Sequence, residues 1–131
     1  MIELSYPHNA IDAISMLIIT LVFLISGITH FTHTAFYVSI MPPLIPWPLF
    51  WVYITAVVEL LLLCGFWIAD TRYYCALGLI LFSLLVFPAN IYMAMYPDRF
   101  SQYSITALYA RLPIQFILMY LCWLAKGPTP N

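Results

Sequence analysis

Four long apolar runs alternate with shorter, more polar links along the chain. Each run has about the 20 residues that a helix needs to cross the hydrocarbon layer of a membrane, and none shows the alternation of a half-buried strand. In lipid, backbone amides need partners within their own segment, so runs of this kind form helices. The pattern predicts membrane-spanning helices at about residues 11–33, 48–69, 73–95 and 104–125.

The links between these helices predict their topology. The last three helices are joined by short links, which makes them antiparallel neighbours. The link between the first two is longer, apolar and rich in proline, with aromatic residues suited to the headgroup zone. We expect a short interfacial helix at about Ala35–Ile40 and then an extended proline-rich segment that forms a lid over one end. The predicted fold is an all-α, integral membrane up-down four-helix bundle.

Composition places the whole chain in the membrane. Of 131 residues, 65% are hydrophobic and only 7% are charged, more apolar surface than a soluble domain of this size can bury. Residues 1–131 therefore form a single four-span domain in contact with the lipid bilayer. The first run lacks a basic leading region and a cleavage site, so we expect it to be retained. No nucleotide-binding loop or catalytic triad order is present, and no nucleic-acid partner is expected.

Five polar residues can converge within the bundle. Their positions in the four helices put all of them in the half of the membrane opposite the termini, with the carboxylate about 16 Å into the second helix at 1.5 Å per residue. They are His30, Glu59, Asn90, Arg111 and Gln115. We interpret them as a cluster that binds a ligand or handles protons.

Glu59 and Arg111 are the strongest candidates for functional residues, because they are ionisable and lie within predicted spans. Burying an unpaired carboxylate costs several kcal/mol, so Glu59 is either protonated or paired, and ionisable residues within spans are usually functional. Two structural alternatives are an ion pair with Arg111 and a hydrogen bond to Thr55. Arg111 could extend to the interface, but a helix that began after it would be too short to span, so we expect it to face inward.

The histidines and prolines extend the cluster. His30 and His33 are three positions apart and share a helical face, but a metal site would need a third ligand, and we expect none. His30 is the better hydrogen-bonding or proton-transferring residue, with plain interfacial polarity as the alternative. Pro88 and Pro113 each bend a helix beside polar side chains, which predicts a cavity wall. In the structural alternative, the side-chain amides of Asn90 and Gln115 only form hydrogen bonds between helices.

Several motifs resemble one known family. They are, in order, GITHF, MPPLIPWP, the lone Glu59 of the second helix, FPANIYMA and RLPIQ. In these the chain resembles the DoxX-like family of small four-helix bacterial membrane proteins, over about Gly27 to Trp123. The residues that match the family pattern are His30, Phe31, Pro43, Glu59, Pro88, Asn90, Arg111, Pro113 and Gln115. The resemblance implies the bundle and the bacterial inner membrane, and named members include a subunit of a thiosulfate:quinone oxidoreductase.

The few basic residues predict an orientation. Arg72 and Lys126 lie on the side of the termini, whereas Arg99 lies on the other side. Basic residues are commoner in cytoplasmic links, so we expect both termini to be cytoplasmic.

Three functions remain open. In the first, the cluster binds a lipid-soluble molecule such as a quinone, and the protein is a subunit of a membrane redox system without an intrinsic cofactor. A soluble or membrane redox partner would supply electrons, and any enzyme activity would be that of a quinone-linked oxidoreductase. In the second, Glu59 carries a proton or cation in a small transporter. In the third, the protein is an assembly subunit of a larger complex. A homo-oligomer is compatible with each.

Overall fold

The computed structural model describes residues 2–129 and confirms the all-helical prediction. The described elements are α1 (Ala10–Thr32), α2 (Thr34–Ser39), α3 (Pro48–Phe66), α4 (Arg72–Met95), the 3-10 helix η1 (Pro97–Phe100) and α5 (Ile105–Ala125). Of these, α1, α3, α4 and α5 are long and apolar enough to cross a membrane. The chain is therefore a multi-pass membrane protein.

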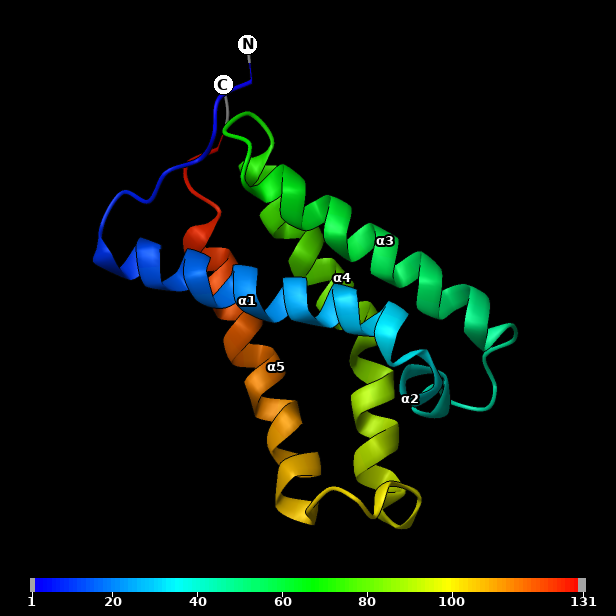
Figure 1. Cartoon of the computed structure of the whole chain (residues 1–131). Coiled ribbons are helices and arrows are strands. Elements are labelled where there is room, and N and C mark those ends of the chain that lie inside the picture. Colours follow the sequence, from blue (N-terminus) through cyan, green and yellow to red (C-terminus); the bar gives the residue numbers. More distant parts are fainter. Residues whose placement is uncertain (1, 130–131) are drawn as a thin grey trace.

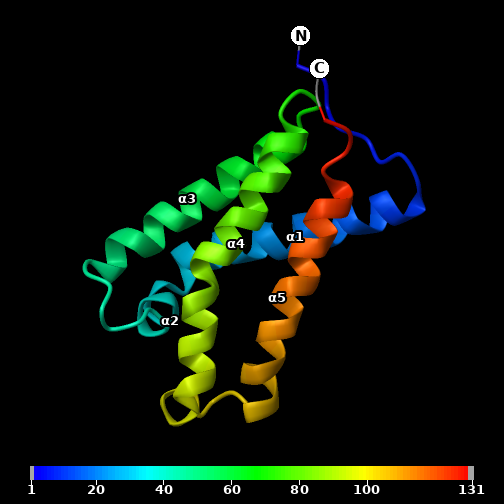
Figure 2. The same ribbon diagram turned by 180° about the vertical axis from the view of Figure 1, so that it is seen from behind.

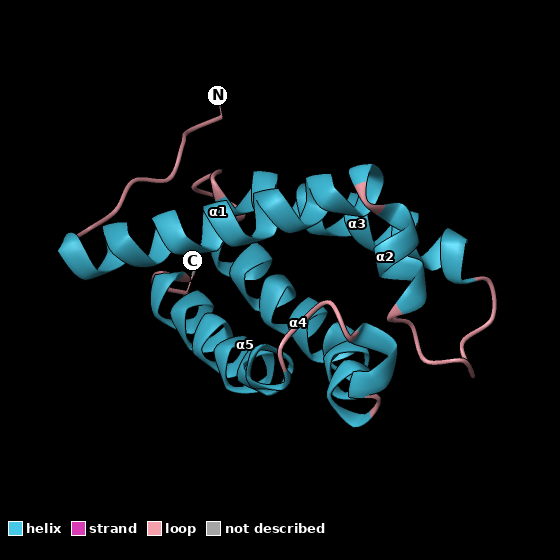
Figure 3. Ribbon diagram, turned by 60° about the horizontal axis from the view of Figure 1, so that its bottom comes forward, coloured by secondary structure: helices cyan, strands magenta, loops and turns pink. Residues whose placement is uncertain are grey.

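The four long helices form two antiparallel pairs. α1 packs on α3 and α4 packs on α5, while contacts between α3 and α4 and between α1 and α5 join the pairs (Figure 1). Viewed from the end opposite the termini, α1 and α3 lie along one side and α4 and α5 along the other (Figure 3). Both termini lie at one end, and the pairs diverge away from it (Figures 1 and 2). This is the predicted up-down bundle, splayed at its far end.

Local sequence signals set most of the helix ends. Asn9 caps α1 by accepting a hydrogen bond from the backbone of Asp12, and Ser104 caps α5 in the same way through Ala107. Pro48 occupies the first turn of α3, where its missing N–H costs nothing. These signals place the starts of the three helices within one residue of the predictions.

The end of α3 differs from the prediction. The helix ends at Phe66, so residues 67–69, predicted to be helical, are not. The N-terminal segment pairs with them instead: Ser5 N–H donates to Trp67 O and Ala69 N–H donates to Glu3 O, each at 2.8 Å. Backbone groups that bond to another segment cannot continue a helical ladder. The sequence of α3 alone contains no sign of this pairing.

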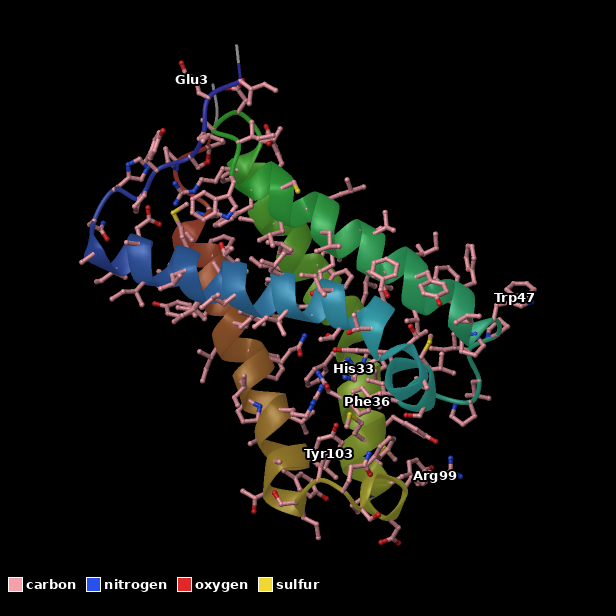
Figure 4. The ribbon with its side chains drawn as sticks, in the orientation of Figure 1. Glu3, His33, Phe36, Trp47, Arg99 and Tyr103 are labelled. Carbon is pink, nitrogen blue, oxygen red and sulfur yellow. The ribbon has the colours of Figure 1, made fainter. Side chains whose placement is uncertain are left out.

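The predicted interfacial helix is present as α2, shifted by one residue. The proline-rich segment follows it and leads into α3 through Trp47, which has a left-handed backbone (φ 52°). Figure 4 shows the Trp47 side chain directed away from the helices, whereas Glu3 lies at the opposite end of the molecule beside the termini. The link also contacts the far end of α4–α5, where the rings of Phe36 and Tyr103 are 5.7 Å apart.

An apolar core fills the half of the bundle nearer the termini. All four long helices contribute to it, and its buried members are Met16, Ile19, Phe23, Leu63, Phe66, Ala76, Leu79, Phe82, Cys122 and Ala125. α3 and α4 approach closely here, since a Cβ at Gly78 would lie 2.7 Å from Leu62 Cδ2. The outer faces of the helices carry exposed apolar side chains, as surfaces in contact with lipid do.

Candidate functional site

A cavity of about 890 Å³ lies between the two helix pairs, in the half of the bundle away from the termini. All four long helices and the link around α2 contribute to its walls. Its lining includes every member of the predicted cluster: His30, Glu59, Asn90, Arg111 and Gln115. The structure therefore places these five side chains around one space, while their role stays a prediction.

The α1–α3 wall carries an imidazole beside a carboxyl group. His30 Nδ1 lies 2.6 Å from the carbonyl oxygen of Ser26. A carbonyl oxygen only accepts, so Nδ1 carries the proton. The same nitrogen is 4.0 Å from Glu59 Oε2. Glu59 is 1% exposed, and its Oε2 has no hydrogen-bond partner among the described residues. The carboxyl group therefore has an unused bonding position within an apolar wall.

The link around α2 closes this wall from the end opposite the termini. The Tyr37 ring stacks on His30 with centroids 3.9 Å apart and planes 18° apart. Its hydroxyl lies 2.7 Å from Thr29 Oγ1. Because the Thr29 hydroxyl also lies 2.8 Å from Ile25 O, to which it donates, Tyr37 donates to Thr29. The next part of the link, residues 40–42 and 45, also lines the cavity, while its role as a lid stays a prediction. The segment is not extended as predicted, because Ile45 N–H donates to Pro42 O at 3.1 Å and closes a turn.

The α4–α5 wall carries a chain of hydrogen bonds. Arg111 Nε donates to Asn90 Oδ1 at 3.1 Å, and Asn90 Nδ2 donates to Gln115 Oε1 at 2.7 Å. Gln115 Nε2 then donates to the backbone carbonyl of Ser83 at 2.9 Å. Arg111 uses only Nε in this chain, which leaves its two terminal nitrogens for other partners. The wall is thus a hydrogen-bond donor surface with a fixed orientation.

Pro88 explains why this wall can form. It lies inside α4 and has no N–H to donate, and α4 changes direction about halfway along (Figure 2). Pro88 and Thr55 both line the cavity, as Asn90 does. The hydrogen bond between Asn90 and Gln115 joins α4 to α5. The two amides therefore join helices, as the structural alternative predicted, and also form part of the cavity wall.

Both structural alternatives for Glu59 are wrong. Among residues 2–129, Arg72 pairs with Asp12 and the basic group near Glu59 is His30 at 4.0 Å, so Arg111 does not pair with Glu59. The Thr55 hydroxyl donates to Trp51 O at 2.7 Å and is not bonded to Glu59. A threonine in a helix readily bonds to the carbonyl one turn back, and here that local partner prevails.

Two residues predicted as secondary members of the site, His33 and Pro113, do not line the cavity. His33 is exposed at the junction of α1 and α2, where its Nδ1 lies 2.8 Å from Thr32 Oγ1, and it does not share a site with His30. In the described part of the chain no three potential metal ligands come together. Pro113 is exposed on α5 and does not line the cavity, so its predicted place in the wall is wrong. His33 is the cap residue between α1 and α2, and Pro113 lies on an exposed face of α5.

Sequence reasoning missed a buried ion pair at the other end of the bundle. Arg72 Nη2 donates to Asp12 Oδ1 and Oδ2 at 2.7 and 2.9 Å, and both side chains are buried. Arg72 also donates to the carbonyls of Ala125 at 2.7 Å and Tyr6 at 3.1 Å. It thereby joins the N-terminal segment, α1, α4 and α5. The available signal was that both opposite charges begin helices on the same side of the membrane.

Comparisons with known proteins give one family. A family model described as a domain of unknown function (DUF8561) matches residues 19–126. No curated protein and no solved structure matches the chain. The matched range includes all residues that line the cavity.

Proposed function

Since the chain belongs to the family described as a domain of unknown function (DUF8561), we propose its function from the cavity: it binds a lipid-soluble small molecule such as a quinone. In this proposal the protein is a subunit of a redox system in the bacterial inner membrane, with both termini cytoplasmic. The observation that carries it is an apolar cavity within the spans, with separate polar groups on two facing walls.

The size and walls of the cavity suit a ligand from the bilayer. A volume of about 890 Å³ lies within the range of small-molecule sites, which are mainly apolar with a few placed polar groups. Some lining residues are also exposed on the outer surface, among them Leu21, Ile25 and Leu85. Apolar side chains shared by the cavity and the lipid-facing surface support entry from the side, through the hydrocarbon.

The two polar walls suit the two oxygens of a quinone. Arg111 can donate to one oxygen, with Asn90 and Gln115 fixing its position. On the opposite wall, Glu59 in its acid form can donate to the other oxygen, and the imidazole of His30, whose Nδ1–H donates to Ser26 O, can exchange a proton beside it. Reduction of the quinone takes two electrons and two protons. The electrons would come from a redox partner protein, as the DoxX-like resemblance of these motifs also suggests.

The apolar core favours binding over transport. A transporter that used Glu59 would need a polar path to both sides of the membrane. Between Glu59 and the terminal end lies the core of Phe23, Leu63, Phe82 and their neighbours. This core supports a cavity with one closed end.

The test is ligand binding by the purified protein. Organic extraction with native mass spectrometry should recover a lipid-soluble molecule at a fixed stoichiometry. A short-chain quinone should quench the fluorescence of Trp51, which lines the cavity, and Trp51→Phe should remove that saturable signal. Arg111→Gln and Glu59→Leu should each weaken binding about tenfold, because each removes a group that donates to a quinone oxygen.

Arg99→Gln is the matched control, because Arg99 is exposed and lies outside the cavity. It should leave quinone affinity unchanged. The proposal is wrong if no lipid-soluble molecule is extracted and no saturable quenching occurs.

A further inference from the structure

Two buried polar atoms in the cavity walls have no hydrogen-bond partner. Among the described residues they are Glu59 Oε2 on α3 and Ser83 Oγ on α4, and both residues are 1% exposed. Buried polar groups in folded proteins are nearly always bonded, so each such exception calls for an explanation. Both residues line the same cavity.

The helix register brings these two atoms to similar depth. α3 and α4 are antiparallel, and their close approaches place Gly65 against Cys75 and Leu62 against Gly78. One further turn along each helix puts Glu59 level with position 81. Ser83 is two residues beyond that position, about 3 Å along the axis at 1.5 Å per residue. The two unpartnered atoms therefore belong to neighbouring parts of adjacent helices.

Ser83 differs from three threonines of α1 and α3. Thr20, Thr29 and Thr55 each donate to the carbonyl four residues earlier, at 2.7–2.8 Å. That local bond is the usual partner of a hydroxyl within a helix. Ser83 does not make it, while its backbone carbonyl accepts from Gln115. Its hydroxyl is thus free to bond to a molecule in the cavity.

We propose that the polar end of the bound ligand is a hydroxyl group, held between Glu59 of α3 and Ser83 of α4. This inference rests on the proposed function. A hydroxyl can donate to a carboxylate or accept from a carboxylic acid, and it can do the converse with a serine. A carbonyl or ether oxygen can only accept. The favoured ligand class is therefore a lipid-soluble alcohol or phenol, and for a quinone couple it is the reduced quinol.

A matched pair of ligands tests this inference. The probes are a long-chain alkylphenol and its methyl ether, in which a methyl group replaces the hydroxyl proton. Native mass spectrometry of the protein in detergent measures their binding. The wild-type protein should bind the phenol about tenfold more tightly than the ether. The preference depends on the residue that accepts from the ligand hydroxyl, because an ether can still accept from the other residue. At least one of the variants Ser83→Ala and Glu59→Leu should therefore reduce the preference to about threefold without weakening the ether, whose binding also shows that the variant is folded.

Control and second variants make the test decisive. Ser15→Ala should leave the preference unchanged, because Ser15 is equally buried but lies outside the cavity. Equal binding of phenol and ether by the wild-type protein overturns the hydroxyl inference and leaves the proposed function standing, and so does a preference that both variants retain. Binding of neither probe overturns both.

Discussion

At the scale of single residues, the charged side chains divide into two kinds. Each nitrogen of the Arg72 guanidinium has a hydrogen-bond partner, since the group donates to Asp12 and to two backbone carbonyls. Glu59 and Arg111 line the same cavity but are not paired with each other. A buried charge with all its partners holds a structure together, whereas unused bonding positions around a cavity are available to a ligand.

Removing one partner of the Asp12–Arg72 pair should destabilise the bundle. Arg72→Leu leaves Asp12 buried and unpaired and removes the link to Ala125, so we expect the free energy of unfolding to fall by about 3–5 kcal/mol. Thermal unfolding in detergent, followed by circular dichroism, measures the loss. Arg99→Gln is the control and should change it by less than about 1 kcal/mol, because Arg99 is exposed. An unchanged unfolding temperature in Arg72→Leu would contradict the role given to this pair.

At the scale of elements, α4 forms much of one polar wall of the site. Pro88, Asn90 and Ser83 all come from it, and the Gln115 amide from α5 bonds to its backbone. Pro88 leaves the carbonyl of Leu84 without its helical donor and favours a bend of α4 beside Asn90. The proline therefore links the shape of α4 to the polar wall of the cavity.

Pro88→Ala should stabilise the protein and weaken ligand binding. Alanine restores an N–H that can donate to Leu84 and favours a straighter helix, which should raise the free energy of unfolding by about 1–3 kcal/mol. The straighter α4 should move Asn90 relative to Arg111 and weaken quinone binding about tenfold. Fluorescence quenching and thermal unfolding measure the two effects. Pro113→Ala is the matched control, since Pro113 is inside α5 but outside the cavity. It should raise stability alone, and unchanged binding by Pro88→Ala would oppose the explanation.

The sequence predicted the long helices better than the contacts between segments that lie far apart in the chain. Apolar runs of the right length are enough to place α1, α3, α4 and α5, because a lipid environment leaves a helix as the only way to satisfy the backbone. The cavity residues followed from depth along those helices. The end of α3 at Phe66 and the Asp12–Arg72 pair could not be predicted in this way, since both depend on contacts between segments far apart in sequence.

At the scale of the whole molecule, the bundle has two unlike halves. The half nearer the termini is an apolar core fixed by Arg72 and by the N-terminal segment. In the other half the helix pairs diverge around the mainly apolar cavity, with α2 and its link across the end (Figure 1). Ligand exchange would therefore involve the far half, while the near half keeps its packing.

This division predicts that the protein does not conduct protons. Reconstituted in liposomes with a pH gradient or a membrane potential, it should give the same proton flux as protein-free liposomes, measured with an internal pH dye. The reason is that Phe23, Leu63 and Phe82 fill the bundle between Glu59 and the terminal side. Glu59→Gln should behave like the wild type. A wild-type flux that Glu59→Gln abolishes would show that the core opens, and would favour the transporter over the ligand-binding subunit.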